Sequence, residues 1–324
     1  MSVNFKTLKS FVTAVDARSL SAAAQQLSVA QPALSQHIAS LEKHFDQKLL
    51  VRSNAGVKPT PAGDRLYRHA QLILSHLDQL ETELARRNDG ASAVSGPVSV
   101  GLATYSTASA LSMPLLKAVR NQYPGINLFI NDNFGLVLSE MVMTGRMDMA
   151  VIYAGVPMKG VTLQPLLSEE LFLIAPTGMK LPESEDGTIP LRALADIDLL
   201  LPSRMHLLRR LIDEALASAG ITPNIRAEIE SSETLRQAIE ANVGATILPA
   251  ALAGVGSPGA APTVRKIVQP VIRTTISLCT PNHVPMSEQA KVVLDLLRAQ
   301  IAQLFATGRD TGISAPANEA TSSN

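Results

Sequence analysis

The sequence has little of what an exported or membrane-embedded protein requires. Its 324 residues contain one cysteine, Cys279, so no disulfide can form within the chain and an oxidising compartment is not indicated. The N-terminus mixes charged and apolar residues and lacks the continuous apolar run of a signal peptide. No stretch of about 18 uncharged apolar residues predicts a membrane helix. We therefore expect a soluble protein of the cytoplasm that does not meet the membrane.

Net charge is also absent, because 28 Lys and Arg balance 28 Asp and Glu. The charges are unevenly placed, however. Residues 1–76 carry nine basic and four acidic side chains, which gives this segment +5 and leaves −5 for the remainder. A basic front joined to an acidic remainder indicates that only the N-terminal part meets a polyanion.

Signals of catalysis and cofactor binding fail when their context is considered. Residues 254–259 match the letters of a dinucleotide fingerprint, but Pro258 and Pro262 stand where a helix is needed and no acidic residue follows to hold a ribose. Two histidine pairs are spaced seven residues apart on predicted helices, about 10 Å, which is too far to share one zinc. No serine elbow, paired catalytic carboxylates or phosphate loop emerges, and Cys279 fits a core residue. We expect no enzyme, no cofactor and no bound metal.

Three short amphipathic patterns open the chain. Apolar residues within 8–15 recur at the spacing of one helix face, and an Ala-rich second helix begins near Ser21. The third begins at Gln31, and Pro32 is tolerated in its first turn. Its predicted inward residues are Leu34, Ile38, Leu41 and Phe45. Since only residues 28–30 separate the second and third helices, the pattern predicts a tight helix-turn-helix corner.

A hairpin and a long helix follow. Extended runs at 49–52 and 57–58 flank a turn at 53–56 and predict a β-hairpin, the wing of a winged helix-turn-helix. Thr60 and Pro61 then cap and open a helix whose apolar residues are spaced alternately by four and three, as in a coiled coil. This dimerisation seam comprises Leu66, Ala70, Ile73, Leu77, Leu80 and Leu84. The alternative is a single amphipathic helix lying on its own chain.

The remainder alternates strands and helices after a Gly/Ser/Ala-rich linker at 88–97. Such alternation is typical of an α/β fold with a parallel-type sheet covered by helices on both faces, here in two lobes with a cleft between them. Strands are expected near 98–102, 126–130, 148–153, 171–175, 197–201, 225–229, 245–248 and 275–279, and helices near 107–122, 135–143, 204–219, 233–242 and 286–305. The small polar residues of the tail predict disorder.

Several runs of residues resemble one known family. SxAA at 21–24, QPALS at 31–35, LE at 41–42, LLxR at 49–52 and GVxPTxAG at 56–63 are similar to the DNA-binding signature of LysR-type transcriptional regulators. YPG at 123–125, GRMDMAV at 145–151 and GATILP at 244–249 resemble that family's effector-domain landmarks. The resemblance covers residues 1–303. The run from GLA at 101–103 to MPLL at 113–116 is similar to the branch of nitrogen assimilation control proteins.

The resemblance implies a domain plan and partners. It comprises a winged helix-turn-helix at 1–60, a linker and dimerisation helix at 61–87, a linker at 88–97, an effector-binding domain at 98–303 and a disordered tail at 304–324. The effector domain would be a two-lobed, periplasmic-binding-protein-like fold, with lobes at 98–165 plus 270–303 and at 166–269. Such proteins are usually homotetramers, built as dimers of dimers, that act on double-stranded promoter DNA with RNA polymerase as a further partner.

Candidate DNA-binding residues lie on the third helix and the wing. The family pattern carries over to Gln31, Pro32, Ser35 and Arg52, while Gln36 stands where relatives often have arginine. Glutamines can pair with adenine edges in the major groove, and basic side chains neutralise phosphates. The remaining candidate contact is Lys58, and Lys6, Lys9, Lys43 and Lys48 are further possible phosphate contacts.

Candidate effector residues are hydroxyls near expected helix N-termini, where free amides attract anions. They are Thr104, Ser106, Thr107 and Ser203, and they favour an anionic small molecule. Each could equally be an ordinary helix cap. An effector-independent regulator of the same type remains the alternative function. A periplasmic solute-binding protein would need an export signal, and a metabolic enzyme would need a catalytic constellation that the sequence lacks.

Overall fold

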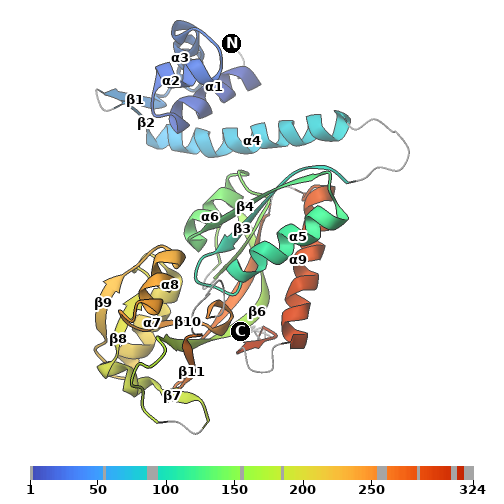
Figure 1. Ribbon diagram of the computed structural model, residues 1–324. Helices are drawn as coiled ribbons and strands as arrows, with labels where there is room; N and C mark the ends of the chain where they lie inside the picture. Colours follow the sequence, from blue (N-terminus) through green and yellow to red (C-terminus); the bar gives the residue numbers. More distant parts are fainter. Residues whose placement is uncertain are drawn as a thin grey trace, which may run out of the picture. The chain divides into compact units, whose positions relative to one another are not determined.

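The computed structural model describes residues 3–53, 56–85, 94–153, 157–183, 186–253, 261–282, 285–307 and 312–316. The chain divides into two compact units, one built mainly from residues 1–92 and the other from 93–143 and 147–324. Figure 1 labels their helices and strands.

The first unit opens with three helices, α1 (Phe5–Asp16), α2 (Leu20–Gln26) and α3 (Gln31–Phe45). Asn4 and Thr7 form a reciprocal capping box at the start of α1. The Ser19 hydroxyl, and not that of Ser21, caps α2 by accepting from the Ala22 amide. The tight corner after α2 and the start of α3 at residue 31 are confirmed.

The core of this unit joins the three helices through fully buried side chains. Phe11, Ala23, Leu34 and Ile38 are all 0% exposed, and Leu41 is 1% exposed. The small side chain of Ala23 lets α2 approach its neighbours closely, and complete burial of Phe11 alone stabilises the unit by about 2 kcal/mol. Phe45 was expected to face inward but is 41% exposed, because α3 ends there and Asp46 takes a left-handed conformation.

The hairpin consists of β1 (Leu50–Ser53) and β2 (Gly56–Pro59), paired antiparallel. Gly56 has φ +109°, and a Cβ there would stand 2.6 Å from the Arg18 carbonyl oxygen, so this position requires glycine. Two residues of the expected turn, 54 and 55, lie outside the described part. Thr60 caps α4 (Pro61–Ala85) as predicted, because its hydroxyl accepts from the Gly63 amide at 3.0 Å.

The second unit has two lobes. Lobe I holds a sheet in the order β4-β3-β5-β12-β6, in which β3 pairs parallel with β4 and β5 while β12 runs antiparallel to its neighbours. The strands are β3 (Gly96–Ala103), β4 (Ile126–Asn133), β5 (Met149–Tyr153), β6 (Val161–Ala175) and β12 (Arg273–Pro281). Its helices are η1 (Ser109–Leu111), α5 (Ser112–Gln122), α6 (Gly135–Met143) and α9 (Glu288–Thr307), and α5 packs on α9.

Lobe II is built on the far end of β6. Residues 171–175 of this strand pair antiparallel with β10 (Thr246–Pro249) and β11 (Thr263–Val268), and β11 pairs with β7 (Thr188–Pro190). The parallel pair β8 (Asp198–Leu201) and β9 (Asn224–Glu228) completes its strands. Its helices are η2 (Leu191–Asp196), α7 (Leu207–Ser218), α8 (Ser232–Glu240) and η3 (Ala250–Leu252).

The two lobes share β6, which was expected as a strand only over 171–175. Its first ten residues pair with β12 in lobe I and its last five pair within lobe II, so the expected lobe boundary at 165/166 falls inside a continuous strand. The sheet is consequently mixed and not purely parallel, because strands that pass between the lobes run antiparallel to one another. One apolar core extends through both lobes.

The tail differs from the expected disorder where it is described. Residues 304–307 continue α9, and β13 (Ile313–Ser314) pairs with Glu169 and Ser168 of β6. The reason is that β6 offers unpaired backbone groups there, and the Glu170 amide donates to the Gly312 carbonyl at 2.9 Å. Residues 308–311 and 317–324 lie outside the described part, as does the glycine-rich loop at 254–260.

Two further features bear on function. None of the helices that the structure describes combines the length and apolar character needed to cross a bilayer. Nor do the described residues contain a cluster of three or more His, Cys, Asp or Glu placed to hold a metal ion. Cys279 lies fully buried in β12 as a core residue, and burial raises the pKa of its thiol to about 12.

Candidate nucleic-acid interface and interlobe cleft

Helix α3 presents a polar edge opposite its buried apolar face. Gln31, Pro32 and Gln36 are exposed and Ser35 is half-buried, while Leu34 between them is 0% exposed. Four of the residues expected to read DNA therefore share one accessible edge of one helix. If Gln31, Ser35 and Gln36 were buried they could not contact DNA, but none of them is buried. This edge offers amide and hydroxyl groups that can donate and accept hydrogen bonds at base edges.

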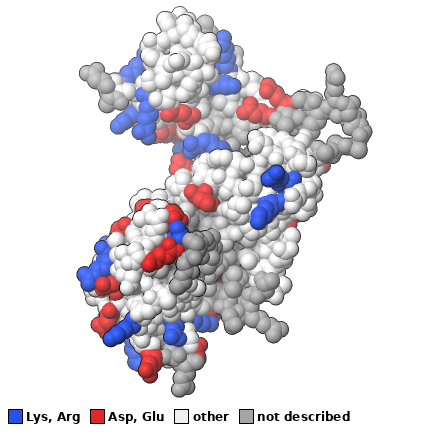
Figure 2. All heavy atoms as spheres, viewed as in Figure 1, with Lys and Arg blue, Asp and Glu red and all other residues white. Residues whose placement is uncertain are grey.

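The wing supplies exposed positive charge. In the register of the hairpin, Arg52 lies opposite Val57 and Lys58 lies opposite Val51. Val57 is buried and anchors the hairpin, whereas Arg52 and Lys58 are exposed. Figure 2 shows Lys and Arg atoms on the flanks of this first unit. The hairpin thus holds both candidate phosphate contacts on two short paired strands.

A carboxylate that sequence reasoning overlooked ties α3 to the wing. Glu42 accepts from the Leu49 amide at 2.9 Å, from the Leu50 amide at 3.4 Å and from the Lys48 ammonium at 2.9 Å. Burial opposes ionisation of this carboxyl, but the hydrogen bonds outweigh burial and lower the pKa of Glu42. Lys48, expected as a further phosphate contact, is therefore paired with Glu42.

A second overlooked contact orients a side chain of α3. The Ser10 hydroxyl, on α1, lies 2.7 Å from Nδ1 of His37, and Ser10 is only 2% exposed. His37 is half-buried. The buried serine therefore fixes the imidazole ring of the third helix, which a helical wheel of α3 alone could not have revealed.

The expected coiled-coil seam on α4 divides into two parts. Ala70 is 0% exposed in the core of the first unit and Leu66 packs partly against that core, so these two residues serve their own chain. Ala70 is therefore a correction to the expected seam, and it arises because α1 packs on α4. Leu77 is half-buried. Ile73, Leu80 and Leu84 are 43%, 49% and 75% exposed, respectively, and remain available to a partner.

The hydroxyls expected to hold an effector precede helices but do not border an open anion site. Ser106 and Thr107 are both 0% exposed, and the Ser106 hydroxyl donates to the Ala103 carbonyl and accepts from the Ala108 amide. The Thr104 amide donates to the Asn133 carbonyl, and the Thr104 side chain is half-buried. Helix α5 begins only at residue 112, so its N-terminal amides are not the ones beside these hydroxyls.

A carboxyl group of the chain itself, that of Glu169, lies beside these residues. The Thr107 amide donates to Oε2 of Glu169 at 3.1 Å, and the Tyr153 hydroxyl hydrogen-bonds to Oε1. Glu169 lies on β6 where the strand passes between the lobes, and it is 0% exposed. Burial raises the pKa of this carboxyl to about 7, although the Thr107 and Tyr153 contacts act in the opposite direction. The expected anion site is thus filled by an internal carboxyl group.

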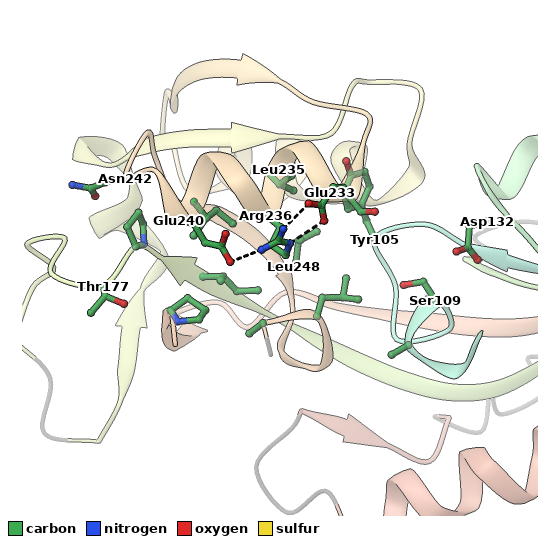
Figure 3. A pocket seen from close by; sticks show the side chains of 18 residues that line it. Tyr105, Ser109, Asp132, Thr177, Glu233, Leu235, Arg236, Glu240, Asn242 and Leu248 are labelled. Carbon is green, nitrogen blue, oxygen red and sulfur yellow. Dashed lines mark hydrogen bonds and ion pairs between the residues drawn. The ribbon is translucent and has the colours of Figure 1, made fainter. Parts of the chain in front are cut away.

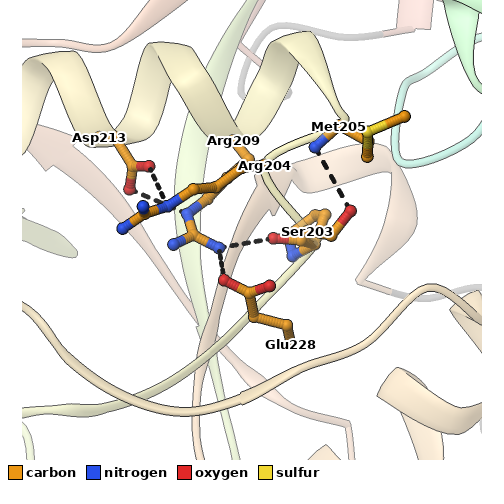
Figure 4. Close-up of polar contacts among 7 residues, drawn as sticks. Ser203, Arg204, Met205, Arg209, Asp213 and Glu228 are labelled. Carbon is orange, nitrogen blue, oxygen red and sulfur yellow. Dashed lines mark hydrogen bonds and ion pairs between the residues drawn. The ribbon is translucent and has the colours of Figure 1, made fainter.

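Ser203 lies in a loop of lobe II and not at the first turn of a helix, since α7 begins at Leu207. A fully buried guanidinium orders this loop. Arg209 donates to the Pro202 carbonyl, to Glu228 and to Asp213, each at 2.8 Å. Figure 4 shows the guanidinium between the two carboxylates. The Ser203 hydroxyl accepts weakly from the Met205 amide at 3.4 Å. The four effector candidates are therefore spread over both lobes, and none lines the cavity described below.

Aromatic side chains of lobe I reach across to lobe II. The Tyr105 hydroxyl donates to the Ile229 carbonyl at 2.9 Å, and Phe134 contacts the ring of His206 edge to face at 4.3 Å between ring centres. His206 also lies 3.0 Å from a carboxylate oxygen of Glu230. Burial nevertheless lowers the pKa of His206, although Glu230 acts to raise it. These contacts connect the lobes beside the cleft.

An interlobe cleft of about 720 Å³ is lined in part by Tyr105. Lobe I contributes Tyr105, Ser109, Ala110 and Asp132, and the rest of the lining comes from lobe II, where α8 supplies more residues than any other element. Figure 3 shows Arg236 in the middle of the lining, with Asp132 and Ser109 at one end and Asn242 and Thr177 at the other. Its volume suits a ligand of drug size, and sequence reasoning had identified none of its polar residues.

Comparisons with known proteins agree with this arrangement. Residues 91–302 match the family model described as the LysR substrate binding domain, and residues 5–64 match that of bacterial regulatory helix-turn-helix proteins of the lysR family. The chain is 39% identical over 300 residues to the nitrogen assimilation regulatory protein nac of Escherichia coli strain K12, covering 93% of this chain and 96% of the relative. The protein of the same name from Klebsiella aerogenes is 37% identical over 301 residues, with the same coverage.

The fold is also similar to that of solved structures. A full-length OxyR variant from Pseudomonas aeruginosa superimposes with a TM-score of 0.69 at 24% identity, covering 93% of this chain and 98% of that one.

Proposed function

Because the chain belongs to the LysR family of bacterial helix-turn-helix regulators, it is a DNA-binding transcriptional regulator, and we propose that α3 and the wing read its operator. One observation supports this assignment above all, namely that the polar edge of α3 is accessible while its apolar face is fully buried. Gln31, Ser35 and Gln36 would contact base edges in the major groove, with Pro32 at the helix entry. Arg52 and Lys58 would contact phosphates.

The assignment of these residues is tested by gel-shift assays of the full chain on genomic fragments. We expect Gln31→Ala to lower affinity for the selected operator by roughly tenfold, as expected for losing one base contact of about 1–3 kcal/mol, and to leave non-specific binding nearly unchanged. Arg52→Ala should weaken binding to every sequence. The matched controls are Gln122→Ala and Arg192→Ala, two exposed positions of the second unit. Unchanged operator affinity in both test variants would remove α3 and the wing from the interface.

We propose that the protein works as a homodimer, and as a dimer of dimers, assembled partly through α4. Three apolar side chains on this helix, Ile73, Leu80 and Leu84, are largely exposed, which is costly for a helix in water unless a partner covers it. A second copy of the chain is the natural occupant, because two-fold dimers match the symmetry of operators with repeated half-sites. Such a regulator would act in the cytoplasm, where promoter DNA and RNA polymerase are found.

We further propose that a small molecule bound between the lobes modulates the regulator. A ligand that binds one relative orientation of the lobes more tightly shifts the population toward it, and the angle between paired dimers on DNA would follow. The alternative is regulation without an effector. Titrating the full chain with metabolites while following its melting temperature separates the two, since a specific ligand must stabilise the folded state.

A further inference from the structure

The charge of the interlobe cleft differs from what an anionic ligand requires. Its described lining contains three carboxylates, Asp132, Glu233 and Glu240, and one guanidinium, Arg236, which leaves a net charge of −2. A cavity walled by one sign of charge repels ligands of that sign. The expectation of an anionic effector, drawn from hydroxyls elsewhere on the chain, therefore finds no support in this cleft.

The single guanidinium of the described lining is already engaged. Nε and Nη2 of Arg236 donate to the two carboxylate oxygens of Glu233, at 2.9 and 2.5 Å, and Nη1 donates to Glu240 at 2.5 Å. Hydrogen bonds from Arg236 and Gln237 lower the pKa of Glu233 to about 2, so this carboxylate stays ionised. An anion would have to displace one of these internal carboxylates to reach Arg236.

Asp132 lacks such a partner. The described residues place no basic group against it, and its hydrogen-bond donor is the Ser112 hydroxyl at 3.4 Å. Partial burial raises the pKa of Asp132 despite that contact, although the residue still reaches solvent at this end of the cleft. An approaching cation would relieve this cost and gain a charge-assisted hydrogen bond.

The N-terminus of α8 does not offset the negative charge. The Ser231 hydroxyl already accepts from the Thr234 amide, and Glu233 occupies the first turn, where a carboxylate matches the helix dipole. Below these polar groups lies an apolar floor formed by Ile174, Leu235 and Leu248, each at most 5% exposed. The cleft therefore combines a hydrocarbon surface with uncompensated carboxylates.

We propose that this cleft binds a cationic, amphiphilic amine, with its ammonium group at Asp132 and its hydrocarbon part on the apolar floor. This inference rests on the proposed function only in taking the cleft as the effector site. DNA binding by α3 and the wing does not depend on it.

The test uses three probes that share one skeleton and differ in charge: 4-phenylbutylamine, 4-phenylbutanol and 4-phenylbutyrate. In isothermal titration calorimetry of the full chain, the amine should bind most tightly, the alcohol less tightly and the carboxylate most weakly. Asp132→Asn should weaken amine binding about tenfold, the loss of one charge-assisted contact. Glu240→Gln, on the other side of Arg236, should weaken amine binding by a smaller factor, because it removes only a more distant negative charge. Glu214→Gln, an exposed position on α7 outside the lining, is the matched control and should change nothing.

Arg236→Gln separates the two ligand charges most sharply. Removing this positive charge should tighten amine binding roughly two- to fivefold, whereas it would weaken an anion. The proposal is overturned if the carboxylate probe binds more tightly than the amine, if none of the probes binds, or if Arg236→Gln weakens amine binding. Gel shifts on the same preparations test DNA binding separately from amine binding. If the protein binds DNA but not the amine, the proposed ligand class is wrong and the proposed DNA interface is unaffected.

Discussion

Glu169 should make the stability of this protein fall as the pH rises through neutrality. The carboxyl group is fully buried on β6, and burial raises its pKa from 4.5 to about 7. A folded-state pKa above the unfolded value means that the proton stabilises the folded chain. The contribution is therefore complete below pH 4.5 and is lost as the pH rises through 7, at a total cost of about 3 kcal/mol at ~1.36 kcal/mol per pKa unit.

The hydrogen bonds around Glu169 agree with a neutral acid. The Tyr153 hydroxyl lies against Glu169 and also within 2.9 Å of the Tyr105 carbonyl, yet it has one proton to donate. If Glu169 is protonated it can donate to Tyr153, which in turn donates to Tyr105, and both contacts are satisfied. Once Glu169 ionises, Tyr153 must donate to it, and the Tyr105 carbonyl loses this donor.

The perturbation is Glu169→Gln, which keeps the shape of the side chain and removes the charge. Urea unfolding of both proteins at about pH 5 and at about pH 8.5 provides the measurement. We expect the variant to equal the wild type or be slightly less stable at the lower pH, and to be more stable by up to about 3 kcal/mol at the higher pH. An equal pH dependence in both proteins would refute the reasoning, as would a variant that is less stable at the higher pH.

Three other variants probe the DNA interface, the dimer seam and the second unit. In DNA-binding titrations, Arg52→Ala should reduce the slope of log affinity against log salt concentration by about 0.9, the value for one lost phosphate contact. An unchanged slope would show that Arg52 does not contact the DNA backbone. Leu80→Glu should shift the chain toward monomers in sedimentation without lowering its melting temperature, because Leu80 is 49% exposed; an unaltered oligomer would exclude this part of α4 from the interface. Arg209→Ala should destabilise the second unit by about 2–4 kcal/mol in thermal unfolding, since Glu228, Asp213 and the Pro202 carbonyl lose their shared donor, while DNA affinity is retained; a loss under about 1 kcal/mol would contradict this.

The first unit could be predicted closely because its signals are local. Helical spacing, a proline in the first turn of α3 and the threonine cap of α4 each depend on residues a few positions apart. What could not be predicted joins distant residues. The Ser10 to His37 contact spans 27 positions, and the burial of Ala70 depends on α1 packing against a helix that begins 45 residues after α1 ends.

The two-lobed architecture of the second unit was predicted, but the part of β6 that connects the two lobes was not. The first ten residues of β6 include Thr162, Gln164, Pro165 and two glutamates, a composition that does not indicate a buried strand. They form a strand because β12 pairs with them from Val161 to Glu170, with one register shift at Leu166, and only the part from Leu167 onward is buried throughout. The helix expected from residue 107 begins at 112, since hydroxyls at Ser106 and Ser109 bond locally and favour turns over regular helix.

The adjacent residues Glu169 and Glu170 show why the charge of a cleft cannot be judged from sequence. Glu170 lies between Lys266, at 2.7 Å, and Arg273, and their hydrogen bonds outweigh burial and lower its pKa. Glu169 points to the other face of the strand, where it meets an amide and a phenol, and its pKa rises. Identical neighbouring side chains thus acquire opposite tendencies to ionise because successive residues of a strand face different surroundings. The same reasoning applies to Arg236. Considered without its neighbours, this arginine would indicate an anion site, but it donates to both Glu233 and Glu240, and its single positive charge offsets only one of these two negative charges.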